Sequence, residues 1–333
     1  MRKQTLSLAA LAAGTALALT ACGGVQTTAG GGSDSGDYPT GAVNMPVGAS
    51  AGGSSDLISR QISRGLSEEL GGSFPVINRE GANGALAAAE VAKADPDGST
   101  ISVQNASLFT ITPLAVPEDQ ATNIDDFDIV QGVSRDDYVL VASKGSGFDS
   151  IDSFADAKGK VTYGTTGVGT GAQLACALTF NVNDTPAEAI PFDGGAPALT
   201  ALLGDQVDTA CLQIGEAIEN IRSGKLTPIV VFGPERVEFL PDVPTAQESG
   251  LEVEVTQYRF MTVPKGTPQD VKDAIAEAMQ ATFETEEYQD FNAQNNLTPM
   301  ELPGDEVVAQ LEEDKQRYAD LVEEYGINLG DAN

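Results

Sequence analysis

From Tyr38 onwards, short apolar runs alternate with stretches whose apolar residues recur at helical spacing. The clearest helix follows a pair of serines and stops at a pair of glycines, and its apolar positions are Leu57, Ile58, Ile62, Leu66 and Leu70. Serine caps the start of a helix, and glycine adopts the left-handed conformation that ends one. Residues 271–283 and 307–325 predict two further amphipathic helices near the C-terminus.

The expected strands are short apolar runs bounded by glycine, proline or polar residues. They lie at residues 42–47, 74–78, 100–103, 129–133, 138–142, 160–164, 189–192, 207–212 and 227–232. Further helices are expected to start near Thr170, Ala196 and Gly215. This alternation predicts layered α/β domains with largely parallel sheets, and the length allows roughly two such domains.

The N-terminal segment has the pattern of an export signal. Two basic residues precede an apolar run at residues 5–19, which is too short to span a membrane, so residues 1–21 are interpreted as a signal peptide. The run ends in Leu19-Thr20-Ala21-Cys22, which resembles the bacterial lipobox, so Cys22 is expected to be acylated. Residues 22–38 are rich in small polar residues and predict a flexible tether.

Composition excludes several classes of protein. The chain has no histidine, which rules out Ser-His-Asp and Cys-His nucleophiles and histidine-bound metals. Its net charge of −31 would repel phosphate backbones and argues against nucleic-acid binding. Beyond Cys22, the remaining cysteines are Cys176 and Cys211, which could form a disulfide after export or stay buried as thiols.

Two glycine-rich loops carry the strongest chemical signal. The loop within residues 46–56 and the loop within residues 163–172 each join an expected strand to an expected helix. Free backbone N–H groups and the helix dipole make such a loop suitable for an anion, although either could be a plain tight turn. The second loop also fits G-x-G-x-x-A, with Asp184 or Glu188 at the spacing of a ribose-binding acid. An exported protein meets no dinucleotide pool, so no cofactor is expected.

Six motifs resemble one family and follow in its order. They occupy residues 46–56, 78–84, 96–98, 164–170, 192–199 and 240–245. The chain is similar to the substrate-binding proteins of tripartite tricarboxylate transporters, also called the Bug or TctC-like family. This resemblance implies a periplasmic-binding-protein type II fold, in which two α/β domains joined by two crossover strands surround a ligand cleft. We expect the crossovers near residues 138–142 and 255–263.

The resemblance also implies domain bounds and a carboxylate site. Domain 1 would comprise residues 39–138 and 260–333, and domain 2 residues 139–259. In the family both loops hold a ligand carboxylate through backbone N–H groups, small hydroxyls and water. The corresponding residues here are Ser50, Ala51, Gly52, Gly53, Ser54, Asp56, Thr165, Thr166, Gly167, Gly169 and Thr170. Asp56 is better interpreted as a dipole partner of the helix start than as a ligand contact.

Other candidates lie at strand ends or depart from the family pattern. Asn105, Ser107 and Gln213 follow expected strands, where open α/β sheets bind ligands, although they could simply cap loops. The family usually has Tyr-Lys-Gly where this chain has Phe192-Asp193-Gly194, so Asp193 is expected to disfavour a second negative charge on the ligand.

A family aromatic, often tryptophan, is replaced by Tyr258, and Arg259 follows it. Arg259 or Arg135 could clamp a carboxylate, the alternative being a solvated residue at the hinge.

The expected protein is a monomeric receptor, lipid-anchored at the outer face of the cytoplasmic membrane. It would capture a small organic carboxylate and deliver it to the large and small membrane subunits of a tripartite transporter. It is not expected to be an enzyme. The alternative is a sensory receptor that presents the same ligand to a membrane signalling partner. The sequence does not name the carboxylate.

Overall fold

The structure is a computed structural model that describes residues 38–330. The expected signal peptide, Cys22 and all but the last residue of the expected tether lie outside the described residues. The strands are β1 Met45–Val47, β2 Val76–Asn78, β3 Ser102–Asn105, β4 Phe127–Arg135, β5 Tyr138–Ser143, β6 Val161–Thr165, β7 Ala187–Pro191, β8 Thr209–Gln213, β9 Leu226–Val231, β10 Tyr258–Pro264 and β11 Thr298–Pro299. The helices are α1 Ser54–Leu70, α2 Ala85–Ala92, α3 Ser107–Thr110, α4 Gly171–Val182, α5 Gly195–Leu203, α6 Ile214–Arg222, α7 Gln269–Phe283, α8 Glu286–Asn295 and α9 Gly304–Glu324.

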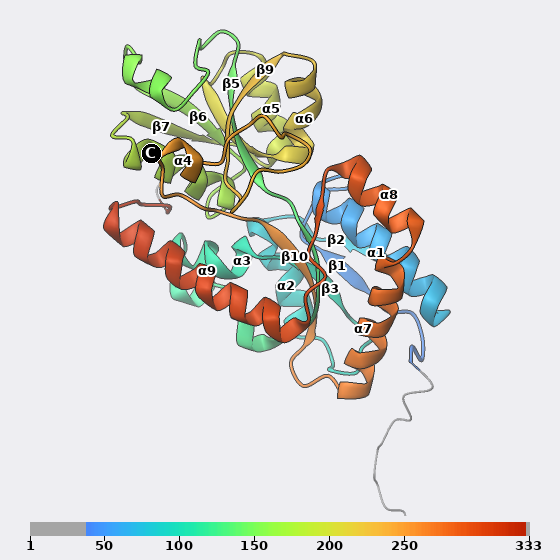
Figure 1. The fold of residues 1–333 in the computed structure, drawn as a ribbon. Coiled ribbons are helices and arrows are strands. Elements are labelled where there is room, and N and C mark those ends of the chain that lie inside the picture. Colours follow the sequence, from blue (N-terminus) through green and yellow to red (C-terminus); the bar gives the residue numbers. More distant parts are fainter. Residues whose placement is uncertain (1–37, 331–333) are drawn as a thin grey trace, which may run out of the picture. The chain divides into compact units, whose positions relative to one another are not determined.

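The strands pair in three sheets. A four-stranded sheet has the order β11-β4-β10-β3, a five-stranded sheet has the order β7-β6-β8-β5-β9, and β1 pairs with β2. Helices α4, α5 and α6 pack against the five-stranded sheet, whereas α1, α7 and α9 pack against strands β3 and β4 (Figure 1). These two groups give the α/β architecture that the sequence predicted.

The expectation of largely parallel sheets is wrong. Every pair in the four-stranded sheet is antiparallel, and β5 runs antiparallel to both β8 and β9. Only β1 with β2, β6 with β7 and β6 with β8 are parallel among the named strands. All residues of β5 and β10 are buried, and a strand buried on both faces has the same apolar pattern in either direction.

Two short segments connect the sheets. Asp136 and Asp137 lie between β4 and β5, and residues 251–257 lead into β10. The two connections are tied together, because the backbone N–H of Asp136 donates to the carbonyl of Gln257 at 2.7 Å. The expected crossover ranges 138–142 and 255–263 fall largely on β5 and β10, each of which belongs to one sheet, and the connecting residues lie immediately before these strands.

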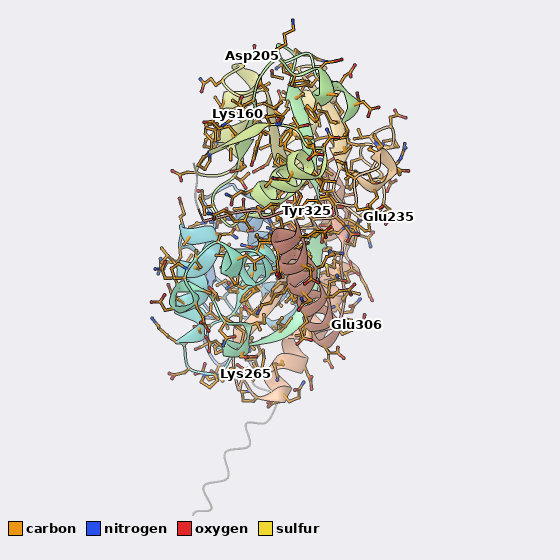
Figure 2. The ribbon with its side chains drawn as sticks, turned by 90° about the vertical axis from the view of Figure 1, so that its left-hand side faces the viewer. Lys160, Asp205, Glu235, Lys265, Glu306 and Tyr325 are labelled. Atoms are coloured by element: carbon orange, nitrogen blue, oxygen red, sulfur yellow. A yellow bond between two sulfur atoms is a disulfide. The ribbon has the colours of Figure 1, made fainter. Side chains whose placement is uncertain are left out.

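Helix α9 braces the second connection. The Tyr258 hydroxyl donates to Asp314 at 2.9 Å, and the N–H of Thr256 donates to the Tyr318 hydroxyl at 3.2 Å. An ion pair of 2.8 Å joins Arg317 to Glu254. Beyond the helix, the half-buried ring of Tyr325 packs against the core that includes the five-stranded sheet (Figure 2). The C-terminal helix therefore contacts both the connection and this core.

Cys176 and Cys211 are paired in the structure. Cys176 in α4 and Cys211 in β8 are fully buried and form a disulfide, with their Cα atoms 5.9 Å apart. The bond links α4 to the sheet on which it packs.

Candidate functional site

The first glycine-rich loop joins β1 to α1. Gly48 packs so closely on Gly84 that a Cβ at residue 48 would overlap the backbone there. Gly52 has a φ of +84°, and Gly53 caps α1 without a side-chain hydrogen bond. The helix therefore begins with backbone donors that no cap side chain occupies, as an anion site requires.

Asp56 fixes the shape of this loop. Its carboxylate accepts hydrogen bonds from the N–H of Gly52 at 2.9 Å and from Asn78 at 2.8 Å, and it pairs with Arg60 at 2.8 Å. Burial raises the pKa of Asp56, but these hydrogen bonds outweigh burial and leave the pKa below its ordinary value. Asp56 is thus a positioning residue, in line with the interpretation of it as a partner of the helix start.

The hydroxyls of the first loop face different surroundings. Ser50 and Ala51 are exposed, and Ser50 donates to Glu80 at 3.0 Å. Ser54 donates to Asp136 at 2.8 Å, and Ser55 accepts from Arg259 at 2.8 Å. The start of α1 is therefore tied to the first connection between the sheets and to the beginning of β10.

The second loop has the same construction between β6 and α4. Gly167 and Gly169 have φ values of +133° and +69°, and the Thr170 side chain caps α4 by accepting from Gln173 at 3.3 Å. Thr166 donates to Thr170 at 3.3 Å. The buried hydroxyl oxygen of Thr165 has no hydrogen-bond partner.

Asn83 ties the segment at residues 78–84 to the second loop, and the sequence analysis did not single it out. Its side-chain nitrogen lies 3.0 Å from the hydroxyls of both Ser107 and Thr112 and 3.4 Å from the carbonyl of Gly169. Thr112 also donates to that carbonyl at 3.1 Å. Asn83 has a left-handed φ of +52°, which an ordinary residue adopts only at some cost. Its place in the motif at residues 78–84 was the available signal.

Asn105 and Ser107 lie in this same network. The Asn105 side chain donates to the carbonyl of Asn83 at 3.1 Å and accepts from Ser107 at 2.9 Å. It also accepts from the N–H of Leu108 at 3.0 Å, so it caps α3 as well. Gln257 donates to Ser107 at 3.0 Å, which connects the network to the second connection.

The remaining candidates of domain 2 have different exposures. Phe192 is half-buried, and its backbone N–H donates to the carbonyl of Thr165 in the second loop at 3.0 Å. Asp193 is exposed, and none of the described residues forms a hydrogen bond or ion pair with it. Gln213 is half-buried at the residue before α6.

The two arginines have unlike environments. Arg135 pairs with Asp137 at 2.9 Å and with Glu235 at 3.8 Å. Arg259 is not a solvated hinge residue: it is 3% exposed, with Nε 2.8 Å from Ser55 and Nη2 3.9 Å from Asp136. Its Nη1 is buried and has no hydrogen-bond partner.

Three carboxyl groups that each have a buried oxygen without a hydrogen-bond partner lie near these arginines, and the sequence analysis missed them; Asp136 and Asp137 are buried and Glu216 is half-buried. Burial raises the pKa of Asp137 to about 6 and that of Asp136 above its ordinary value. Burial, together with the charge of Asp136, raises the pKa of Glu216 to about 7. The acidic pair Asp136-Asp137 between two apolar strands was the available signal, since isolated acids are rarely buried without a reason.

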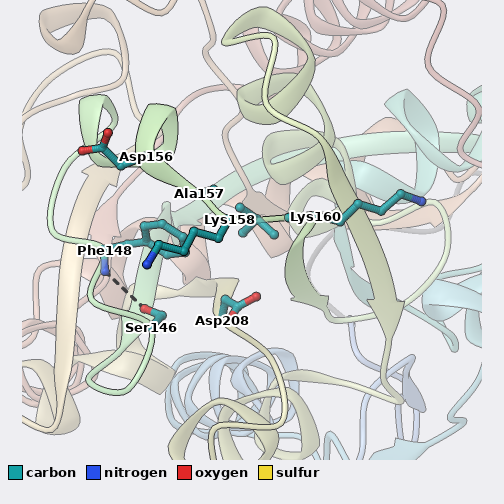
Figure 3. Close-up of a pocket in the computed structure, with 9 residues that line it drawn as sticks. Ser146, Phe148, Asp156, Ala157, Lys158, Lys160 and Asp208 are labelled. Atoms are coloured by element: carbon teal, nitrogen blue, oxygen red, sulfur yellow. Dashed lines mark hydrogen bonds between the residues drawn. The ribbon is translucent and has the colours of Figure 1, made fainter.

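The described residues also form a pocket away from the predicted site. A pocket of about 410 Å³ lies at the N-terminal ends of β6 and β8 (Figure 3), and none of the predicted ligand-binding residues lines it. Its residues are Ser146, Phe148, Asp156, Ala157, Lys158, Gly159, Lys160, Val161 and Asp208. Within residues 38–330, no group of three acidic or cysteine side chains is placed to hold a metal ion, and no helix has the length and apolar character of a membrane span.

Comparison with known proteins identifies the family of this chain. Residues 58–327 match the model described as the tripartite tricarboxylate transporter family receptor, TctC. The chain belongs to the TctC receptor family. It is 32% identical over 254 residues to a UPF0065 protein encoded in the TAR-I ttuE-ttuC' intergenic region of Agrobacterium vitis, covering 74% of this chain and 72% of that protein.

Solved structures of TctC-type receptors have the same fold. The periplasmic binding protein BugD is 28% identical with a TM-score of 0.77, covering 87% of this chain and 99% of BugD. MatC from Rhodopseudomonas palustris, solved with bound malate, is 28% identical with a TM-score of 0.76, covering 86% of this chain and 100% of MatC. The expected family and two-domain periplasmic-binding-protein fold are confirmed, and the TctC family is one of solute-binding receptors.

Proposed function

We propose that this protein is an extracytoplasmic receptor that captures a small organic carboxylate and delivers it to a tripartite membrane transporter. Family membership supports the receptor role, and the malate bound to MatC supports a carboxylate ligand. The family description, a receptor of tripartite tricarboxylate transporters, supports delivery to such a transporter, and we propose a large and a small membrane subunit as the partners. We propose that the chain binds and releases its ligand unchanged, without catalysis.

The observation that carries this proposal is the environment of Arg259. A guanidinium group stays charged at any physiological pH, and a buried donor without an acceptor is costly. Arg259 is 3% exposed, its Nη1 is unpartnered, and its Nε reaches Ser55 in the first turn of α1. A ligand carboxylate would supply the missing acceptor beside the free N–H groups of that helix start.

We assign the ligand carboxylate to the two glycine-rich loops and Arg259. The proposed contacts are Ser50, Ala51, Gly52, Gly53 and Ser54 from the first loop, Thr165, Thr166, Gly167, Gly169 and Thr170 from the second, and Arg259. The unpartnered hydroxyl of Thr165 supports the second loop. Asn105, Ser107 and Asp56 hold the loops in place, and Phe192, Asp193 and Gln213 would lie at the margin of the site.

Calorimetry of the full chain against mono-, di- and tricarboxylates tests this site. Arg259→Gln should weaken binding by about 10- to 150-fold, because a hydrogen bond to a charged group contributes about 1.5–3 kcal/mol. The control is Arg236→Gln, since Arg236 is an exposed arginine paired with Glu248. Unchanged affinity in the Arg259 variant, or no binding of any carboxylate by the native chain, would overturn the proposal.

We propose further that acylated Cys22 anchors the receptor. The support is the lipobox-like sequence Leu19-Thr20-Ala21-Cys22 directly after the apolar segment. Cys22→Ser should release the protein from washed membranes or leave an unprocessed precursor. Native protein with an unmodified N-terminus beyond Cys22 would refute the anchor.

A further inference from the structure

Charged side chains gather where the two connections meet the start of α1. Asp136 is 2% exposed and accepts from Ser54 at 2.8 Å, and Arg259 is 3% exposed and donates to Ser55 at 2.8 Å. The closest recorded approach of their charged groups is 3.9 Å. One polar atom of each residue is buried without a hydrogen-bond partner: Asp136 Oδ1 and Arg259 Nη1. The same holds for Oε2 of the nearby Glu216.

This cluster touches the starts of helices from both sheets. Glu216 lies in the first turn of α6, and its carboxylate rests against Gly195 at the start of α5, where a Cβ would overlap it. The ring of Tyr138 rests in the same way against Gly171, the first residue of α4. The cluster therefore contacts the starts of α1 and α5, and Tyr138, which follows the Asp136-Asp137 pair in the chain, contacts the start of α4.

The charges of the cluster do not balance for a simple carboxylate ligand. Arg135 and Asp137 form their own pair, which leaves Arg259 as the cation facing Asp136 and Glu216. When both acids are ionised, the site holds two negative charges for one arginine, and a ligand with one carboxylate brings a third. Like charges brought together out of water repel strongly, and this cost falls on binding.

A purely structural role for the acids does not account for their free oxygens. Asp136 and Glu216 could stabilise helix starts through the dipole. Buried polar atoms in folded proteins nevertheless almost always have partners, and Asp136 Oδ1 and Glu216 Oε2 have none. Two carboxylate oxygens without donors next to a guanidinium nitrogen without an acceptor form a pattern that complements a molecule carrying both charges.

We infer that the ligand is a zwitterion, whose carboxylate is bound by Arg259 and the loops and whose ammonium group is bound by Asp136 and Glu216. This inference rests on the proposed function and narrows its ligand class to amino acids and related aminocarboxylic acids. An ammonium group supplies three donors and one positive charge, so a zwitterion adds no net charge to the cluster. A hydroxyl in the same position supplies one donor and leaves the excess negative charge.

Matched acids that share a carbon skeleton test the inference. Calorimetry of the full chain would compare propanoate, lactate and alanine; succinate, malate and aspartate; glutarate, 2-hydroxyglutarate and glutamate; and butanoate with 4-aminobutanoate. In the series that binds, the amino acid should bind at least tenfold more tightly than its hydroxylated and unsubstituted counterparts. Equal or tighter binding of a counterpart would overturn the inference and leave the proposed function standing. Absence of binding in all series would overturn the inference, and absence of binding of any mono-, di- or tricarboxylate would overturn the proposed function as well.

Variants assign the preference to these carboxyl groups. Asp136→Asn and Glu216→Gln should each reduce the ratio of amino-acid to hydroxy-acid affinity at least tenfold, while hydroxy-acid binding is retained or strengthened. Glu219→Gln is the matched control, because this glutamate lies on the same helix with 80% of its side chain exposed. If Asp136→Asn fails to fold, Glu216→Gln decides on its own. An unchanged ratio in a folded Glu216→Gln variant would overturn the assignment.

Discussion

Replacing Glu216 by glutamine should change how the stability of the ligand-free protein depends on pH. Burial raises the pKa of this carboxyl, the charge of Asp136 raises it further, and together they move it from 4.5 to about 7. The hydrogen bond from the backbone of Gln213 and the charge of Arg259 lower the pKa and only partly offset these effects. The folded state therefore holds the Glu216 proton more tightly than the unfolded state does.

The sign and size of the effect follow from this difference. Because the folded state binds more protons between pH 4.5 and 7, the free energy of unfolding falls as the pH rises through that range. One pKa unit corresponds to about 1.36 kcal/mol, so ionising Glu216 costs the native protein about 2–3 kcal/mol between pH 5 and pH 8. Glu216→Gln removes this cost, because the amide does not ionise.

Urea unfolding at pH 5 and pH 8 measures this effect. The native chain should lose about 2–3 kcal/mol more stability between these values than Glu216→Gln does. Asp137, whose pKa is also raised, to about 6, contributes equally to both proteins and cancels in the comparison. The exposed Glu219→Gln control should keep the native dependence. If Glu216→Gln retains the full native slope, the carboxyl is solvated and the reasoning is refuted.

Three other changes have defined outcomes. Gly48→Ala should lower the free energy of unfolding by about 1–3 kcal/mol or more, because its Cβ would overlap the backbone of Gly84; urea unfolding measures this, and native stability would contradict the close packing. Reducing the disulfide between Cys176 and Cys211, 35 residues apart in sequence, should destabilise the chain by about 3–4 kcal/mol, and an unchanged melting temperature in reductant would argue against the bond. Thr166→Asp should abolish carboxylate binding in calorimetry by placing a like charge at the second loop, and native affinity would exclude that loop from the site.

Local patterns in the sequence predicted most elements but not how strands pair. The apolar runs predicted strands β1 to β9 within a few residues, whereas β10 followed from the family resemblance and β11 was not predicted. The serine pair expected to cap α1 lies inside that helix, and Gly53 is its N-cap. Helix α8 was missed because it buries only Tyr288 and Asn292 and so has no apolar stripe. Strand direction was wrong for β5 and β10, since strands that are buried throughout carry no mark of direction.

The candidate site likewise has parts that local sequence patterns predicted and parts that they did not. The glycine-rich loops were predictable because a strand, a glycine run and a capped helix follow one another in sequence. Asn83, Asp136 and Glu216 were not singled out, because their roles depend on neighbours far along the chain. Asn83 reaches Gly169 across 86 residues, and Ser54 reaches Asp136 across 82.

The sequence by itself determined the α/β class, the family and the position of two glycine-rich loops at helix starts. These features arise from residues adjacent in the chain, where spacing, capping and glycine conformation act locally. Only the tertiary structure decided that Arg259 is buried, that Asp136 lies beside it, and that the two cysteines pair. Whether a charge is buried and paired depends on which distant segments of the chain pack around it and exclude water. Here those segments are the two connections, α1 and α6.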